Sequence, residues 1–219
     1  MEKVSRKNPA KFTDSILEEI VKQVNQRIIK GVCLDPFAGS GKIAKIKQFT
    51  NIEIHCNDIE DGWKEDYDVD VWYHQDAEFL VTDRTFDAII TSPTYGNRMA
   101  DHHKANDGSR RITYTHRYGQ KLSDGNTGVM HFGKEYKDKH TRIFANLRKL
   151  LKSNGLLMVN VSNFIRNGEE VDVVGWWKDM LTNVGFSFIE DVPIATPRMK
   201  FGANRTKRVQ NENLLIWKR

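Results

Sequence analysis

Four polar residues stand at the ends of short apolar segments in this sequence of 219 residues: Asp35, Asp58, Asp76 and Ser92. Continuous apolar segments of this kind are typical of strands buried on both faces of a parallel sheet. In an open α/β sheet the ligand lies beyond the carboxyl ends of the strands, where the strand order reverses. We therefore expect the four side chains to meet in one ligand-binding crevice.

The first of these residues begins a glycine-containing loop, Asp35-Pro36-Phe37-Ala38-Gly39-Ser40-Gly41. Glycines after a first strand can also bind a dinucleotide, whose pyrophosphate lies at a helix N-terminus. Here the full G-x-G-x-x-G spacing is absent, and the Asp35 carboxylate would repel the phosphates. An acid at this position suits a ligand that carries a cationic amino group.

The acids after the next two predicted strands indicate what else the ligand contains. Asp58 is placed to accept hydrogen bonds from ribose hydroxyls, with Glu60 as a competitor for that role. Asp76 could bond an adenine amino group. Any one of these acids alone could be a helix cap or a turn former. A ligand with an amino acid end, a ribose and an adenine would satisfy all three acids together, and S-adenosylmethionine is such a ligand.

A second motif, Thr91-Ser92-Pro93-Thr94-Tyr95-Gly96, follows the apolar segment 86–90. By itself, a Ser-Pro pair after a strand indicates only a turn. If this motif lies beside the cofactor loop, residues 92–95 would hold a planar base next to the methyl donor.

The two motifs together resemble the paired cofactor and catalytic motifs of the DNA amino-methyltransferases, which methylate adenine N6 or cytosine N4. Asn8-Pro9-Ala10-Lys11-Phe12 resembles the family's N-terminal cofactor motif, whose Phe lies against the cofactor. The cofactor motif precedes the catalytic motif with no long domain between them, which is similar to the family's gamma arrangement. The predicted cofactor site comprises Lys11, Phe12, Asp35, Pro36, Phe37, Gly39, Ser40, Gly41, Asp58, Ile59, Asp76 and Ala77.

The resemblance implies direct transfer to a flipped base, with Ser92, Pro93, Thr94 and Tyr95 as the catalytic residues. Exocyclic amines are poor nucleophiles because their lone pair is delocalised into the ring. Ser92 Oγ and the Pro93 carbonyl would accept the amino hydrogens and align the nitrogen, and Tyr95 would stack on the base. Thr94 stands where the family commonly has a second proline, a residue that stiffens a loop by fixing φ.

Basic residues are concentrated in two segments, where we expect nucleic acid to bind. Residues 97–142 hold 10 Lys and Arg against 5 Asp and Glu, and residues 197–219 hold 7 against 1, although the formal net charge is only +5. Such residues release counterions when they neutralise phosphates, and arginines interleaved with aromatic residues suit stacking on bases. The predicted contacts are Arg98, Arg110, Arg111, Tyr114, Arg117, Lys200, Arg205 and Lys207.

The histidines, the cysteines and the apolar segments indicate which metal sites, disulfides and membrane spans to expect. Five of the seven histidines lie between His102 and His140, but their spacing matches no standard zinc pattern, so no metal is predicted. Cys33 and Cys56 are expected to be buried free thiols. No apolar segment approaches the roughly 18 residues of a membrane span, and no signal peptide is apparent. We expect a cytoplasmic protein with no membrane partner.

The alternation of elements predicts an α/β fold with a doubly wound, mostly parallel, seven-stranded Rossmann-like methyltransferase sheet and an antiparallel C-terminal hairpin. Residues 96–135 lack sustained periodicity and form a predicted substrate-binding insertion in a single domain, 1–219. Strands are expected at 32–34, 52–56, 71–74, 86–90, 156–161, 186–190 and 213–217, and helices at 14–29, 42–47, 136–152 and 171–183.

Two other functions stay open on the sequence alone. Guanine-N2 methyltransferases of tRNA carry a similar catalytic motif, which makes an RNA base a second candidate substrate. A catalytically silent module that binds S-adenosylmethionine and nucleic acid is a third hypothesis, favoured only if Thr94 disables the site.

Overall fold

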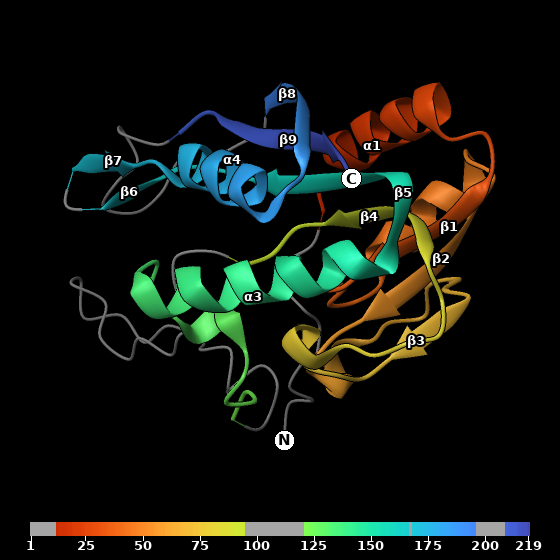
Figure 1. Ribbon diagram of the computed structural model, residues 1–219, viewed down its shortest axis with the longest axis horizontal. Helices are drawn as coiled ribbons and strands as arrows, with labels where there is room; N and C mark the ends of the chain where they lie inside the picture. Colours follow the sequence, from red (N-terminus) through yellow and green to blue (C-terminus); the bar gives the residue numbers. More distant parts are fainter. Residues whose placement is uncertain (1–11, 95–120, 167, 196–208) are drawn as a thin grey trace, which may run out of the picture.

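A computed structural model of the chain describes residues 12–94, 121–166, 168–195 and 209–219. Within these residues the main sheet has seven strands in the order β3-β2-β1-β4-β5-β9-β8 (Figure 1). Neighbouring strands from β3 to β5 are parallel, whereas β9 is antiparallel to both β5 and β8. The strands are β1 (Gly31–Asp35), β2 (Ile52–Asn57), β3 (Val71–Tyr73), β4 (Phe86–Thr91), β5 (Leu151–Val161), β8 (Ser187–Ala195) and β9 (Asn211–Lys218).

Helices cover both faces of this sheet (Figure 1). The α-helices are α1 (Asp14–Arg27), α3 (Lys134–Leu150) and α4 (Val173–Val184). Short 3₁₀ helices are η1 (Lys42–Gln48), η2 (Asp61–Trp63), η3 (Ala77–Phe79) and η4 (Thr127–Val129). Among the described residues, no helix combines the length and the apolar character that crossing a membrane requires.

The central strands send alternate side chains into two separate cores, as the two-residue period of a strand requires. On β4, Ile89 packs with the core under α3 and α4, while Ala88 and Ile90 pack with the core under α1 and η1. On β9, Trp217 belongs to the first core and Ile216 to the second. A sheet covered on both faces explains why these strands read as continuous apolar segments.

The predicted fold class is confirmed, since the sheet is mostly parallel and ends in the antiparallel pair β8–β9. Both cysteines are buried free thiols, as expected. The segment after the glycine loop is a 3₁₀ helix and not a regular α-helix. In addition, α3 ends at Leu150 and passes directly into β5, although the helix was expected to run to residue 152 and the strand to begin at residue 156. Asn154 instead adopts a positive φ of 65° inside β5.

A two-stranded hairpin after β5, formed by β6 (Phe164–Arg166) and β7 (Glu169–Val171), was not predicted. Each of its strands has three residues, too short a stretch for an alternating pattern to stand out from a loop. The hairpin projects from the end of β5 beside α4 (Figure 1).

Candidate active site

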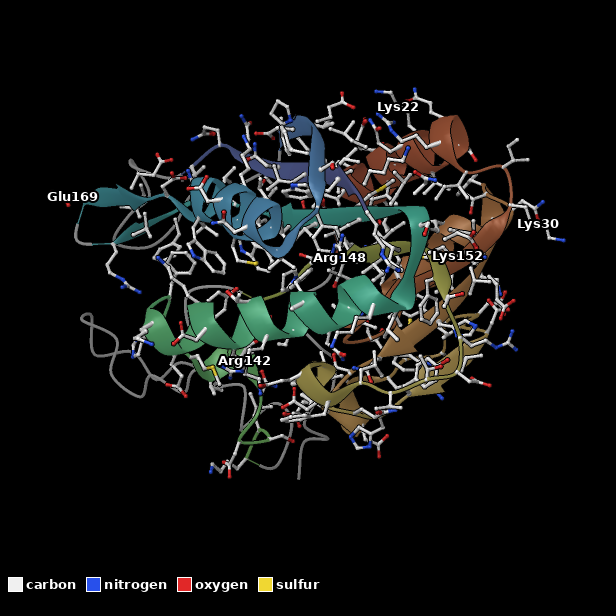
Figure 2. All side chains as sticks on the ribbon, in the orientation of Figure 1. Lys22, Lys30, Arg142, Arg148, Lys152 and Glu169 are labelled. Carbon is white, nitrogen blue, oxygen red and sulfur yellow. The ribbon has the colours of Figure 1, made fainter. Side chains whose placement is uncertain are left out.

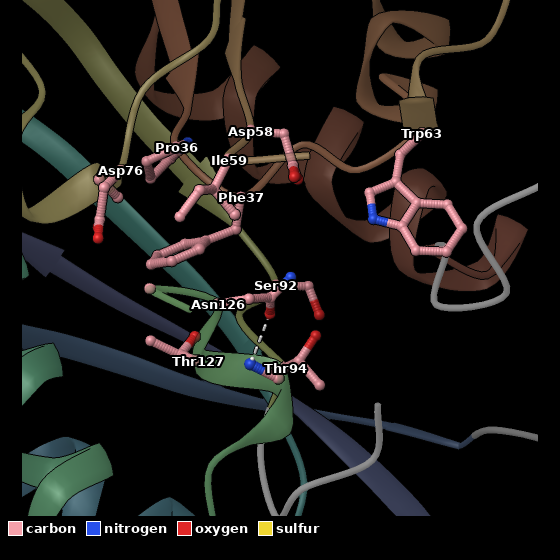
Figure 3. A pocket seen from close by; sticks show the side chains of 13 residues that line it. Pro36, Phe37, Asp58, Ile59, Trp63, Asp76, Ser92, Thr94, Asn126 and Thr127 are labelled. Atoms are coloured by element: carbon pink, nitrogen blue, oxygen red, sulfur yellow. Dashed lines mark hydrogen bonds between the residues drawn. The ribbon is translucent and has the colours of Figure 1, made fainter. Parts of the chain in front are cut away.

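A pocket lies at the carboxyl ends of the parallel strands (Figure 3). Its walls come from the loops after β1, β2, β3 and β4, together with the segment 125–128 that precedes α3. The lining residues are Pro36, Phe37, Asp58, Ile59, Trp63, Asp76, Ala77, Ser92, Thr94, Gly125, Asn126, Thr127 and Gly128. The structure therefore brings predicted cofactor residues and predicted catalytic residues to one cavity, at the edge where α/β sheets bind ligands.

Two glycines give the loop after β1 its shape. Gly39 and Gly41 have φ of 54° and 81°, a left-handed conformation that side chains with a Cβ rarely adopt. A Cβ on Gly41 would also lie 2.7 Å from the Trp72 ring. The Gly39 N–H donates to Asp58 Oδ2 at 2.7 Å, which ties this loop to the loop after β2.

Asn57, at the end of β2, connects three neighbouring loops. Its amide nitrogen donates to the carbonyls of Pro36 and Gln75, at 3.1 and 3.0 Å, and its amide oxygen accepts from the Gln75 N–H at 3.0 Å. The residue is fully buried, so the three bonds replace the water that its amide has lost. This buried amide fixes the spacing of the carboxyl ends of β1, β2 and β3.

Asp35, at the end of β1, is only 1% exposed; its neighbours Pro36 and Phe37 line the pocket, and Asp35 itself does not. Its Oδ1 accepts hydrogen bonds from Thr91 Oγ1 at 2.6 Å and from the Phe37 N–H at 3.1 Å. Its Oδ2 is buried with no hydrogen-bond partner among the described residues. Burial raises the pKa of Asp35 from 3.8 to about 7, because water no longer stabilises the charged form and the two hydrogen bonds compensate only in part.

Asp58 and Glu60 both follow β2 but have different surroundings. Asp58 lines the pocket, and burial raises its pKa to about 6 against the effect of hydrogen bonds from the N–H groups of Glu60 and Gly39. The buried Glu60 carboxylate accepts instead from Ser123 N, Ser123 Oγ and Asn126 Nδ2, at 2.7, 3.2 and 2.9 Å. Of the two candidates for a ribose contact, the geometry favours Asp58.

Asp76 is held by two contacts at the edge of the pocket. Its Oδ1 accepts from the Glu78 N–H at 3.0 Å, and its Oδ2 accepts from Lys139 Nζ on α3 at 2.6 Å. Arg142, which Figure 2 labels on α3, pairs with Glu78. A Cβ on Gly125 would lie 2.4 Å from Asp76 Oδ2, so a larger residue there would have to displace this carboxylate. An adenine contact at Asp76 would share the carboxylate with Lys139.

The described part of the catalytic motif faces the same pocket. Ser92 and Thr94 line it, and Pro93 between them is buried. The Thr94 carbonyl accepts a hydrogen bond from the Tyr136 hydroxyl at 3.0 Å. This bond restrains the loop at the position where the resembling family commonly has a second proline.

The aromatic ring of Phe37 has a fixed support. It stacks on His140 of α3, with ring centroids 5.7 Å apart and planes inclined by 24°. Burial lowers the pKa of His140 to about 4, so this imidazole is neutral near pH 7 and serves as packing.

Some predicted site residues lie away from the pocket. Phe12 is buried in the core under α1 and η1, and its carbonyl accepts from Lys42 Nζ at 2.7 Å. Gly39, Ser40 and Gly41 are buried behind the pocket wall. The following predicted residues lie outside the described part of the chain: Lys11, Tyr95, Arg98, Arg110, Arg111, Tyr114, Arg117, Lys200, Arg205 and Lys207. Within the described ranges, no group of three or more His, Cys, Asp or Glu could hold a metal ion.

Several site residues were missed by sequence reasoning. Trp63 and the four residues Gly125 to Gly128 line the pocket, and the hydrogen bond drawn in Figure 3 joins the Gly128 N–H to Asn126 Oδ1 at 2.8 Å. The segment 125–128 joins the site through a contact with a residue some sixty positions away, Asn126 with Glu60, so no local pattern marks it. The turn composition of Asp124-Gly125-Asn126 was its only signal.

Comparisons with known proteins identify the fold. No family model and no curated protein matches the sequence. The solved structure of the N-methyltransferase NodS from Bradyrhizobium japonicum WM9 is similar over 94% of this chain and 98% of that one, with 12% identity and a TM-score of 0.53. Magnesium protoporphyrin IX methyltransferase from Synechocystis PCC 6803, solved with bound S-adenosylhomocysteine, matches over 93% and 81%, with 12% identity and a TM-score of 0.55.

A third structure is 1,6-didemethyltoxoflavin-N1-methyltransferase from Burkholderia thailandensis, solved with 1,6-didemethyltoxoflavin and S-adenosylhomocysteine. It matches over 93% of this chain and 76% of that one, with 12% identity and a TM-score of 0.53. At such low identity these likenesses establish the Rossmann-like methyltransferase fold alone.

The raised pKa of Asp35 predicts a pH-dependent stability. Between about pH 4 and about pH 7 Asp35 is ionised in the unfolded chain but still protonated in the folded one, so its contribution to the free energy of unfolding falls as pH rises. Asp35→Asn should remove this loss. The variant's stability relative to wild type should rise between pH 4.5 and pH 8 by on the order of 2 kcal/mol, measured by urea unfolding.

The control is Asp61→Asn, which changes an exposed acid close to the same site. Its stability difference from wild type should not vary over this pH range. An Asp35→Asn difference that is equally flat would show that the carboxyl group is ionised normally in the folded protein.

Proposed function

We propose that this protein is an S-adenosylmethionine-dependent methyltransferase that acts on an exocyclic amino group of a DNA base, cytosine N4 or adenine N6. The observation that carries the proposal is the meeting of Asp58 and Asp76 with Ser92 and Thr94 around one pocket of a methyltransferase fold. Two motifs that lie far apart in sequence thereby face a common space (Figure 3).

The acidic residues fit S-adenosylmethionine. Asp35 has a buried carboxylate oxygen that no group in the described part of the chain bonds, and a cationic amino group would supply a partner. Asp58, on the pocket wall, suits a pair of ribose hydroxyls, and the loop after β3 with Asp76 and Ala77 suits the adenine. When bound, S-adenosylmethionine supplies an electrophilic methyl group. Of the similar structures, those from Synechocystis and Burkholderia thailandensis were solved with S-adenosylhomocysteine, the demethylated product of that cofactor.

The catalytic motif fits an amino group as the acceptor of the methyl. An exocyclic nitrogen becomes a nucleophile when its hydrogens are bonded by acceptors that hold it in line with the methyl group. Ser92 Oγ at the pocket wall and the Pro93 carbonyl are such acceptors, and neither forms a covalent bond with the base. Tyr95, the next residue, would stack on the flipped base.

The concentration of basic residues and the resemblance to DNA amino-methyltransferases favour DNA as the substrate. The basic segments 97–142 and 197–219 carry the Lys and Arg that would contact phosphates. The first of them begins directly after the catalytic motif, so a nucleic acid held there would present a base to Ser92. An RNA base is the alternative within the same chemistry.

The cofactor assignment predicts the effect of Asp58→Ala. Loss of hydrogen bonds between a carboxylate and the ribose should weaken binding of S-adenosylhomocysteine by about tenfold or more. Isothermal titration calorimetry measures this affinity directly. The exposed neighbour Asp61→Ala is the matched control and should bind as wild type. Equal affinity in wild type and a folded Asp58→Ala variant would contradict the assignment.

The reaction is tested by isotope transfer. Wild type incubated with methyl-tritiated S-adenosylmethionine and unmethylated DNA should place the label on N4-methylcytosine or N6-methyladenine after digestion to nucleosides. Ser92→Ala should lower this transfer while cofactor affinity stays unchanged, because the hydroxyl contacts the acceptor base.

A parallel incubation with RNA separates the alternatives. Label found only on an RNA nucleoside would replace DNA with RNA as the substrate. Label on no nucleoside, with cofactor binding intact, would contradict both enzymatic hypotheses and leave the catalytically silent binding module.

A further inference from the structure

Asn160 of β5 lies beside Ser92 and is 2% exposed. Its Nδ2 is 3.3 Å from Ser92 Oγ and 2.8 Å from Glu212 Oε2 of β9. Its Oδ1 is buried with no hydrogen-bond partner among the described residues. An apolar side chain would avoid the free-energy cost of that unpaired oxygen, so the fold alone does not account for an amide at this position.

Glu212 determines which way the Asn160 amide faces. An ionised carboxylate only accepts hydrogen bonds, so it pairs with the amide nitrogen and not with the amide oxygen. The same nitrogen has a second hydrogen, which is directed at Ser92 Oγ. Glu212 therefore keeps the amide nitrogen, which is a donor, next to the Ser92 hydroxyl, and keeps the amide oxygen, which is an acceptor, away from it.

The hydroxyl of Ser92 is constrained on two sides by Asn160. Its hydrogen is donated to the Asn160 main-chain carbonyl at 3.2 Å, and one of its lone pairs accepts from Asn160 Nδ2. A serine hydroxyl has one hydrogen and two lone pairs, so one lone pair remains. Ser92 lines the pocket, and the remaining lone pair is the group that it can offer there.

We propose that Asn160, oriented by Glu212, is a positioning residue that keeps the Ser92 hydroxyl in the role of hydrogen-bond acceptor toward the methyl-accepting amino group. A hydroxyl free to rotate would spend part of its time with its own hydrogen facing the amino hydrogens, which is the wrong polarity. The inference rests on the proposed function and adds to it two residues, from β5 and β9, that do not touch the substrate.

The test compares Asn160→Ala with Asn213→Ala. Asn213 is a matched control because its amide also pairs with a carboxylate, Asp191, at 2.7 Å within the same sheet. Steady-state transfer from tritiated S-adenosylmethionine to unmethylated DNA, or to RNA if only RNA accepts label, gives kcat and KM. Calorimetry with S-adenosylhomocysteine and thermal unfolding give cofactor affinity and Tm.

Asn160→Ala should lower kcat about tenfold, the effect of one hydrogen bond, with KM for the nucleic acid and cofactor affinity unchanged. Asn213→Ala should keep the wild-type kcat even if its Tm falls. Should Asn160→Ala fail to fold, Glu212→Ala leaves the amide in place and should lower kcat in the same direction.

Two results would overturn the inference while the proposed function stands. One is a wild-type kcat in folded Asn160→Ala, or in Glu212→Ala where Asn160→Ala does not fold. The other is an equal fall in kcat for Asn160→Ala and Asn213→Ala, which would indicate a general structural role. Absence of any transfer by wild type would instead overturn the proposed function, and the role of Asn160 with it.

Discussion

The hydrogen bond from Thr91 Oγ1 to Asp35 Oδ1, 2.6 Å long, joins two neighbouring strands, β1 and β4, whose loops both contribute to the site. Asp35 ends β1 at the cofactor loop, and Thr91 ends β4 directly before Ser92. Both residues are buried, so the bond lies where water does not compete with it. The other oxygen of this carboxylate has no hydrogen-bond partner within the residues that the structure describes, and burial raises the pKa of Asp35. A destabilising group of this kind is expected at a functional site and not in a purely structural core.

The end of the insertion is part of the site. Glu60 binds Ser123 and Asn126, and Lys139 of α3 binds Asp76, so the segment before α3 and α3 itself return to the wall of the pocket. The loops after β2 and β3 are thus connected to the segment before α3 and to α3 itself through buried or partly buried polar contacts. The Tyr136 hydroxyl on the Thr94 carbonyl adds a further connection from α3 to the catalytic loop.

The sequence predicted the sheet because burial on both faces leaves a strong pattern, as in Ile89 and Ile90, which enter opposite cores. The glycines at positions 39 and 41, and the acids at the strand ends, likewise predicted the loops in which they lie. The partners of Glu60 and Asp76 could not be predicted, since they depend on where residues some sixty positions away come to lie. The hairpin β6–β7 was missed because three-residue strands carry no periodic signal. The site could therefore be located from its strand ends, but the parts of its wall formed by Trp63 and residues 125–128 could not.

The most direct test of the central claim is a crystal structure of the protein with S-adenosylhomocysteine. The claim predicts the amino group of the ligand at Asp35 Oδ2, its ribose hydroxyls on Asp58 and its sulfur directed toward Ser92. A ligand bound elsewhere, or bound in this pocket with its sulfur directed away from Ser92, would contradict it.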